Sequence, residues 1–410
     1  MNLAMRGRRD LRLGPRPLAL HLANSNLAWL SSSIAWPLWK NGSLPWKAEL
    51  ANRAENLRQS ASAASADAFG QALERELRRR SDLFLRGIER YRHHSYRRAM
   101  PEMPPLWEEG TTRLLDYAPG GGAPVLVVPS LINKGYILDL APGNSLLRYL
   151  AGQGLRPLLL DWNAPGEIEK KFGLTDYIAG RIERAAEVAA KTTGCKLAVL
   201  GYCMGGLLAL ALAQRRPDLV SSLALLATPW AFHVERAREA RALGALAGPF
   251  AASFAATREV PVDVLQALFT ALDPLLATRK FMRFAEIEDE QALASRDFVA
   301  LEDWLNDGVP LALPAALECL GQWYGADAPG RGEWRVAGRA VLPAEVGQRS
   351  LVILPAQDRI VPPKSAAALG DALPNAEVLR PTLGHIGMVV AHDAPRAVWG
   401  PLGKWLRGRP

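Results

Sequence analysis

One cysteine stands in a setting that suits a nucleophile. Cys203 is the centre of GYCMG (201–205), which follows an apolar run and precedes a helical pattern. This is the G-x-S-x-G pattern of a nucleophile elbow, with cysteine in place of serine. A sharp strand-to-helix turn strains the backbone there, and the two glycines leave room for neighbouring backbone. The positive end of the helix favours a thiolate, and the Met204 N–H can bind an oxyanion. A small buried cysteine in a glycine-rich turn is the plainer alternative.

Two candidate partners follow in the chain order that this motif requires, which is nucleophile, acid, histidine. Asp358 lies just past the apolar run SLVIL (350–354), where the acid is expected. His385 comes later, between two glycines that allow a tight loop facing the site. The rival is His392, and the glycines favour His385. We therefore predict a catalytic triad of Cys203, Asp358 and His385.

The loop after the apolar run VLVVP (125–129) is expected to supply a second oxyanion donor. We predict the backbone N–H of Leu131 or that of Ile132. Ser130 and Asn133 are expected to shape the loop and not to react.

The remaining cysteines carry no chemical signal. Cys195 and Cys319 are interpreted as packing residues, because no C-x-x-C spacing supports a zinc site. The sequence also lacks GxxxxGK[ST] and GxGxxG motifs. We therefore expect no metal, no cofactor and no cofactor-binding residues.

Short apolar runs alternate with helical patterns from about residue 106 onward. The runs are rich in Val, Ile and Leu and are bounded by turn residues: 125–129, 157–161, 196–200, 223–226 and 350–354. Strands buried on both faces of a parallel sheet have this composition. Helical patterns fall near 144–153, 174–193 and 206–215. The alternation predicts a mostly parallel, doubly wound sheet, and the elbow motif with its two partners makes an α/β-hydrolase fold the expected form of it. An early strand pair is expected, in which 112–117 turns through Gly120–Gly122 into the next strand.

Two further regions differ from this rhythm. Between about 231 and 349 the pattern is helical and amphipathic, which predicts a cap insertion over the active site of a catalytic domain, 106–410. Residues 1–105 are predicted as a basic, partly helical extension. Within it, 1–60 is expected to be irregular, and a helix is expected to run from about Leu73 to Tyr96. Four tryptophans of the irregular part are expected to dock on the chain's own core: Trp29, Trp36, Trp39 and Trp46.

The basic charge is confined to the N-terminal quarter. The formal net charge is +8, and residues 1–100 hold 18 Lys and Arg against 8 Asp and Glu. Such a segment can contact an anionic surface, an acidic partner or nucleic acid. A solvated arginine-rich helix face is the simpler interpretation, and we expect no nucleic-acid partner. Three cysteines do not suggest a disulfide framework and fit a reducing compartment. No apolar stretch is long enough for a membrane span, so we predict a cytoplasmic protein.

Several segments resemble the polyhydroxyalkanoate synthases, which polymerise 3-hydroxyacyl-CoA into storage polyester. They span about 105–395: PSLINKGYILDL (129–140), LLLDWN (158–163), LTDYI (174–178), LGYCMGG (200–206), LEDWLNDG (301–308), AQDRIVPP (356–363) and GHIGMVV (384–390). Trp304 and Asp307 match the family's cap motif. The sequence departs from the family at Arg359, where a histidine is usual, at Leu383 in its glycine pair and at Asn163 in its D-W-G segment.

The resemblance implies a covalent mechanism. His385 would deprotonate Cys203, whose thiolate would hold a 3-hydroxyacyl group taken from CoA, and Asp358 with His385 would activate the next 3-hydroxyl group. The implied partners are 3-hydroxyacyl-CoA, as substrate, and the growing polyester. A homodimer, a partner subunit and association with the storage granule stay open. Two alternatives remain: a thioesterase or polyester depolymerase on the same scaffold, and a non-catalytic partner-binding protein.

Overall fold

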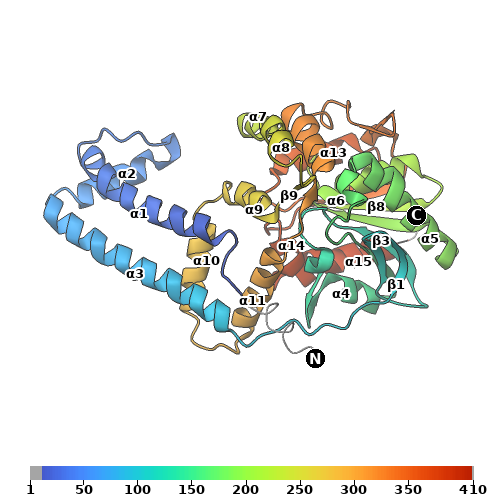
Figure 1. Cartoon of the computed structure of the whole chain (residues 1–410), viewed down its shortest axis with the longest axis horizontal. Coiled ribbons are helices and arrows are strands. Elements are labelled where there is room, and N and C mark those ends of the chain that lie inside the picture. The colour runs from blue at the N-terminus through green and yellow to red at the C-terminus, as the bar shows by residue number, and fades with distance from the viewer. Residues whose placement is uncertain (1–11, 409–410) are drawn as a thin grey trace. The chain divides into compact units, whose positions relative to one another are not determined.

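The computed structural model describes residues 12–408 (Figure 1). Two compact units divide the chain: residues 1–96 with 266–306 form the first, and residues 97–265 with 307–410 form the second. Residues 266–306, which the sequence pattern placed inside the cap, thus cluster with the N-terminal residues. The predicted extension (1–105), catalytic domain (106–410) and cap (231–349) stay predictions.

An eight-stranded sheet forms the centre of the second unit, in the order β1-β2-β6-β3-β7-β8-β13-β14. Its strands are β1 (Pro105–Glu109), β2 (Thr112–Asp116), β3 (Ala123–Val128), β6 (Leu155–Asp161), β7 (Leu197–Tyr202), β8 (Val220–Leu226), β13 (Arg349–Ile353) and β14 (Ala376–Leu379). Neighbours from β6 to β14 pair in parallel. All five predicted apolar runs lie in this sheet, as β3, β6, β7, β8 and β13, so the predicted mostly parallel sheet is confirmed.

The early strand pair was predicted wrongly. β2 pairs antiparallel with β1 and with β6, and β6 lies between β2 and β3. The tight turn is at Gly110, with φ +59°, and joins β1 to β2. Strand β1 was missed because it is an edge strand whose residues are only partly buried and end in Glu108 and Glu109. Such a strand lacks the continuous apolar run of its central neighbours.

Helices flank the sheet of the second unit (Figure 1), four of them between its strands along the chain and two after its last strand, β14. They are α4 (Leu146–Gly152), α5 (Glu183–Thr193), α6 (Met204–Arg215), α13 (Pro363–Ala372), α14 (Gly387–Val390) and α15 (Gly400–Arg407). The first three confirm the predicted helical patterns, although a π-helical segment, η3 (Asp176–Ile182), precedes α5. Helix α6 packs against β3, β7 and β8, and residues 204–214 are all buried. It is therefore a rigid mount for the residue at its N-terminus.

Short elements follow β8 in the second unit. They are α7 (Ala237–Gly244), α8 (Ala247–Ser253), β9 (Glu259–Val260), β10 (Leu311–Ala312), α12 (Leu313–Glu318), the π-helical η4 (Cys319–Gly325), β11 (Arg335–Val336) and β12 (Arg339–Ala340). β9 pairs with β10, so the chain re-enters this unit beside the point at which it left. Helix α7 packs on η4.

Helices build the first unit: α1 (Leu18–Lys40), α2 (Ala48–Ser60), α3 (Ala66–His93), α10 (Leu276–Ala285) and α11 (Leu293–Asn306), while α9 (Val262–Thr270) crosses the boundary between the units. The helix predicted near 73–96 is confirmed as α3, which begins earlier. The prediction that residues 1–60 are irregular is wrong over α1 and α2. Helix α1 was missed because it is apolar on two faces and so shows no one-sided period. Across residues 12–408, no helix has the length and apolarity to span a bilayer.

The tryptophans of this segment dock unequally. Trp36 is buried and stacks on Phe69 of α3, with ring centroids 3.7 Å apart. Trp29 and Trp39 are half-buried. Trp46 is 46% exposed. Docking on the chain's own core is therefore confirmed for Trp36 and wrong for Trp46, which lies in the connection between α1 and α2.

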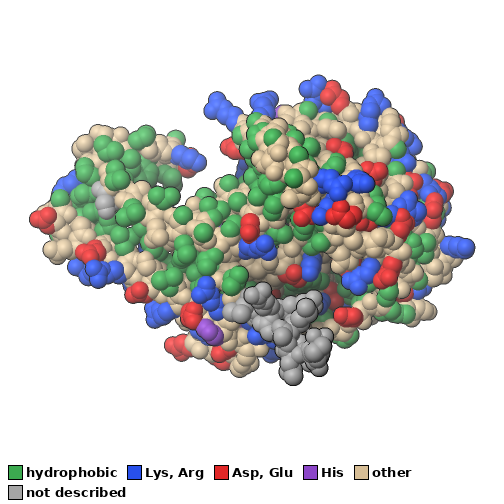
Figure 2. Space-filling model, viewed as in Figure 1, with side chains coloured by type: hydrophobic (Ala, Val, Ile, Leu, Met, Phe, Trp, Pro, Cys, Tyr) green, Lys and Arg blue, Asp and Glu red, His purple; other side chains and the backbone are tan. Residues whose placement is uncertain are grey.

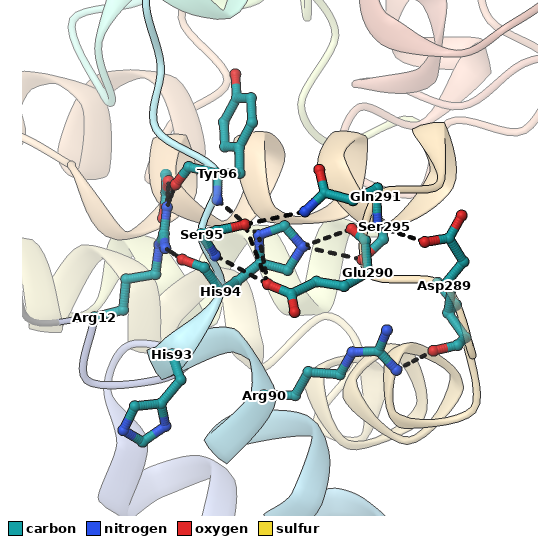
Figure 3. A network of polar contacts seen from close by, with 12 residues as sticks. Arg12, Arg90, His93, His94, Ser95, Tyr96, Asp289, Glu290, Gln291 and Ser295 are labelled. Atoms are coloured by element: carbon teal, nitrogen blue, oxygen red, sulfur yellow. Dashed lines mark hydrogen bonds and ion pairs between the residues drawn. The ribbon is translucent and has the colours of Figure 1, made fainter.

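A polar network ties the start of the described chain to α3 and α11 within the first unit (Figure 3). The Arg12 guanidinium donates to Asp303 Oδ1 at 2.6 Å and to the carbonyl oxygens of His94 and Tyr96. The Tyr91 hydroxyl donates to the same Asp303 carboxylate at 2.9 Å. Because the Arg12 side chain is only 8% exposed, this ion pair is largely shielded from water.

Candidate active site

Cys203 occupies a strained turn between β7 and α6. β7 ends at Tyr202 and α6 begins at Met204, and the cysteine between them has φ +55° and ψ −127°. Non-glycine residues rarely adopt positive φ, and such strain gathers at functional sites. Backbone bonds hold the turn, since the Cys203 N–H donates to Leu226 O at 2.8 Å and the Gly206 N–H donates to Cys203 O at 2.9 Å. The predicted nucleophile elbow is present.

The glycines around Cys203 are required by close backbone approach. A Cβ on Gly205 would collide with the carbonyl oxygen of Val128, at the end of β3. A Cβ on Gly201 would lie 2.5 Å from the Cα of Gly206, and one on Gly206 would meet the Thr228 hydroxyl. The motif is therefore explained by packing of the elbow on β3 and β8, in addition to the turn itself.

His385 and Asp358 meet as predicted. His385 Nδ1 lies 2.7 Å from Asp358 Oδ2, and both side chains are buried. The other carboxylate oxygen accepts the backbone N–H groups of Ile360 and Val361 at 2.8 and 2.9 Å. The Tyr202 hydroxyl donates to the His385 carbonyl oxygen at 3.2 Å. These bonds fix the histidine ring and commit Nδ1 to the acid, which leaves Nε2 for a third group.

That third group is Cys203, which is hydrogen-bonded to His385. Burial alone would lower the pKa of His385, but the Cys203 charge and the bond to Asp358 outweigh burial and raise that pKa to about 10. The site thus favours a protonated His385 imidazole beside Cys203. Cys203 is half-exposed, so a substrate can reach its sulfur.

The predicted oxyanion donors differ in their bonding. Met204 opens α6, so its N–H is among the first four of the helix, which have no intrahelical acceptor. The N–H of Ile132 donates to Ser130 Oγ at 3.0 Å and holds the loop after β3. Of the two alternatives, this leaves Leu131 as the better second donor. Asn133 shapes the loop as predicted, with φ +65°.

An aromatic group on η4 lies within electrostatic range of the cysteine. Burial and the Cys203 charge raise the pKa of Tyr324 well above its usual value. Its ring meets that of Phe232 edge to face, with centroids 4.9 Å apart. His233 Nε2 lies 2.8 Å from the Tyr324 carbonyl oxygen, and Asp327 accepts the N–H of Phe232 at 2.7 Å. The sequence analysis missed this cluster, because no spacing links η4 to the elbow.

Comparison with known proteins places this chain in a family. The α/β hydrolase fold model matches residues 123–391. A poly(3-hydroxyalkanoate) polymerase subunit PhaC of Synechocystis is 30% identical over 295 residues, which are 70% of this chain and 78% of that protein. The chain belongs to the PhaC polymerase family of the α/β hydrolase fold.

Other similarities differ in extent. The PhaC subunit of Haloferax mediterranei is 27% identical over 318 residues, and the aligned part spans 74% of this chain but only 63% of that protein. Among solved structures, a monoacylglycerol lipase of Paleococcus ferrophilus is 15% identical, covers 72% of this chain and 98% of its own, and superposes with a TM-score of 0.45.

The other candidate residues of this PhaC-family chain fall outside the site. His392, the rival histidine, is exposed. Cys319 is buried, as predicted, but Cys195 is exposed, so its interpretation as a packing residue is wrong. It begins the turn before β7, where the apolar run has not yet entered the sheet. Among residues 12–408, no cluster of three His, Cys, Asp or Glu side chains is arranged to hold a metal ion.

Proposed function

We propose that this chain polymerises 3-hydroxyacyl groups from CoA thioesters into polyester, with Cys203 as the covalent acyl carrier. One observation carries the proposal: in a member of the PhaC family, Cys203 on a strained elbow is hydrogen-bonded to a histidine that Asp358 orients. Cysteine suits acyl transfer between thioesters, because the acyl-enzyme and the acyl-CoA have similar energies.

Acylation follows from the bonding of His385. Nδ1 is held by Asp358, so Nε2 takes the Cys203 proton. The thiolate sulfur attacks the thioester carbonyl carbon, the C–S bond to CoA breaks, and the CoA sulfur leaves as a thiol after receiving that proton. A new thioester then joins the acyl group to Cys203.

The tetrahedral intermediate carries a negative oxygen that must be stabilised. We propose the backbone N–H groups of Met204 and Leu131 as its two donors. Met204 is the first residue of α6, and Leu131 lies in the loop that follows β3. Removal of one such donor typically costs a factor of about 100–1,000 in turnover.

Chain growth uses the same base. His385 accepts the proton of an incoming 3-hydroxyl group, whose oxygen attacks the Cys203 thioester and displaces the sulfur. The freed Cys203 thiolate then attacks the CoA thioester of the unit just added, CoA leaves as a thiol with the proton held by His385, and the lengthened chain is again bound to Cys203. We therefore also propose that the enzyme stays at the surface of its insoluble product.

The direct test is to incubate the purified chain with 3-hydroxybutyryl-CoA and to measure free CoA and acyl products together. We expect CoA release with insoluble polyester, and loss of both in Cys203→Ala. The matched control is Cys195→Ala, which removes an exposed cysteine and should retain activity. Release of CoA with only free 3-hydroxybutyrate would instead establish a thioesterase.

A further inference from the structure

The Tyr324 hydroxyl is a hydrogen-bond donor that the fold itself does not use. Tyr324 lies on η4, where its carbonyl oxygen accepts from His233 Nε2 at 2.8 Å. Its side chain is partly buried, yet no group among residues 12–408 is hydrogen-bonded to its hydroxyl. The Tyr202 hydroxyl differs, because it donates to the His385 carbonyl oxygen. A tyrosine whose ring is packed in a core usually pairs its hydroxyl, so the unpaired hydroxyl of Tyr324 suits a ligand.

A short run of chain joins Tyr324 to the nucleophile. The Cys203 N–H donates to the carbonyl oxygen of Leu226, the last residue of β8. The chain continues from there to Phe232, whose ring meets that of Tyr324 edge to face, with centroids 4.9 Å apart. Cys203 and Tyr324 also pack against the same hydrophobic core. The Cys203 charge and burial raise the pKa of Tyr324, so the hydroxyl stays protonated and can donate within electrostatic range of the sulfur.

A 3-hydroxyacyl group on Cys203 has two oxygen atoms that can accept hydrogen bonds. The thioester oxygen already has two proposed donors, the N–H groups of Met204 and Leu131. The oxygen on carbon 3 has none. It is a hydroxyl oxygen in the first unit bound and an ester oxygen once the chain has grown, and it accepts a hydrogen bond in both forms. A phenol donor therefore fits both forms, whereas a carboxylate acceptor would fit only the hydroxyl.

The rings beside Tyr324 suit the alkyl part of the same group. Phe232 stacks on Trp323 with centroids 6.0 Å apart, and Trp323 meets Trp334 edge to face at 5.3 Å. All three rings are buried. An apolar wall of this kind binds an alkyl chain but discriminates poorly between a plain and a hydroxylated one. In such a site the few polar groups determine specificity, and Tyr324 supplies one.

We propose that the Tyr324 hydroxyl donates a hydrogen bond to the oxygen on carbon 3 of the acyl group held by Cys203. The site would then prefer 3-hydroxyacyl thioesters to plain acyl thioesters, because a plain acyl group leaves this donor unpaired. The inference rests on the proposed acyl transfer at Cys203. Tyr324 determines specificity in this scheme, and proton transfer stays with His385.

The test compares two thioesters that differ only in this hydroxyl group. 3-Hydroxybutyryl-CoA or butyryl-CoA is mixed with excess enzyme, so that a single turnover is observed, and the rate of CoA release is measured. Wild type should release CoA faster from 3-hydroxybutyryl-CoA. In Tyr324→Phe the ratio of the two rates should fall by about fivefold or more, as expected for the loss of one neutral hydrogen bond. The matched control is Tyr149→Phe, which removes the hydroxyl of a partly buried tyrosine on α4 and should keep the wild-type ratio.

A binding measurement separates this inference from the proposed function. Calorimetry with Cys203→Ala reports the affinity for each thioester without acyl transfer. The preference for 3-hydroxybutyryl-CoA should be present in that variant and should disappear when Tyr324→Phe is added. A wild type without a preference would overturn the inference, and so would a Tyr324→Phe enzyme that slows equally with both thioesters or keeps the binding preference. Failure of wild type to release CoA from either thioester would instead contradict the proposed function, and the binding preference would still test the contact with Tyr324.

Discussion

Helices α6 and α1 have similar composition but different surroundings. Both are rich in Leu and Ala and are apolar on more than one face. In α6, every residue from Met204 to Gln214 is buried, against β3, β7 and β8 on the sheet side. In α1, Leu27, Leu30, Ile34 and Leu38 are exposed, and Figure 2 shows hydrophobic side chains gathered over this helix. The apolar residues of α6 are thus buried by its own chain, whereas several of those of α1 are not.

This difference in burial decides how firmly each helix is held. Burial of α6 fixes its first residue, so Cys203 can be held in a strained conformation without the turn relaxing. Exposure of α1 leaves apolar side chains in contact with water. A similar composition thus supports a rigid catalytic turn in one unit and a partly exposed helix in the other.

Truncation of one leucine in each helix measures the contrast directly. Leu210→Ala in α6 removes a fully buried side chain and should lower the free energy of unfolding by about 2–5 kcal/mol. Leu30→Ala in α1 should change it by no more than about 0.5 kcal/mol, when urea unfolding is followed at concentrations where the chain is monomeric. Equal effects would mean that the Leu30 side chain is buried by its own chain.

Substitution of the elbow glycine Gly205 should lower both the stability and the activity of the chain. In Gly205→Ala, the new Cβ would collide with the Val128 carbonyl oxygen. Overpacking of this kind should destabilise the second unit by about 1–3 kcal/mol and abolish CoA release. Gly152→Ala, at the end of α4, is the control, because a Cβ there meets nothing within 4 Å. An active Gly205→Ala enzyme would show that the elbow can move away from β3.

The Arg12 network leads us to expect a loss of stability in the first unit. Asp303→Asn removes the charge that accepts from Arg12 and Tyr91 and should cost about 1–3 kcal/mol. Thermal unfolding followed by tryptophan fluorescence can measure it, and Asp82→Asn, an exposed acid of α3, is the control. If both variants melt like wild type, the network does not stabilise the unit.

The last prediction concerns the proton on His385. The pKa of His385 is raised from the usual 6.5 to about 10, so its protonated form favours the folded state. This contribution is complete below pH 6.5 and is lost as the pH rises through about 10. Burial lowers the pKa of His385 and the Cys203 charge raises it. Cys203→Ala removes that charge and should lower the pKa of His385, which NMR of labelled histidine can follow. An unchanged pKa of His385 would show that Cys203 does not act on the imidazole, and Cys195→Ala serves as control.

Much of the second unit could be predicted because its signals are local. Strands buried on both faces must be continuous apolar runs, and the elbow needs glycines close to its nucleophile. Asp358 and His385 follow from chain order and from the turn residues beside them. The edge strand β1 was not predicted for the opposite reason. It is half-exposed and carries two glutamates, so it does not form a continuous apolar run.

The remaining misses depend on contacts that sequence spacing does not encode. The position of Tyr324 near Cys203 depends on two hydrogen bonds around η4. One joins the Phe232 N–H to Asp327, and the other joins His233 to the Tyr324 carbonyl oxygen. The bond that occupies the Ile132 N–H depends on how Ser130 turns within its loop. Helix α1 was not predicted because its apolar residues lie on two faces. Such a helix does not show the one-sided apolar periodicity by which an amphipathic helix is recognised.

The central claim is that Cys203 carries the acyl group, and mass spectrometry of the trapped enzyme tests it most directly. Butyryl-CoA lacks the 3-hydroxyl group, so it can acylate the cysteine but cannot extend the chain. After brief incubation and acid quench, we predict a butyryl adduct on the peptide that contains Cys203, and none on Cys195 or in Cys203→Ala. CoA release without an adduct at Cys203, or an adduct at another residue, would contradict the account.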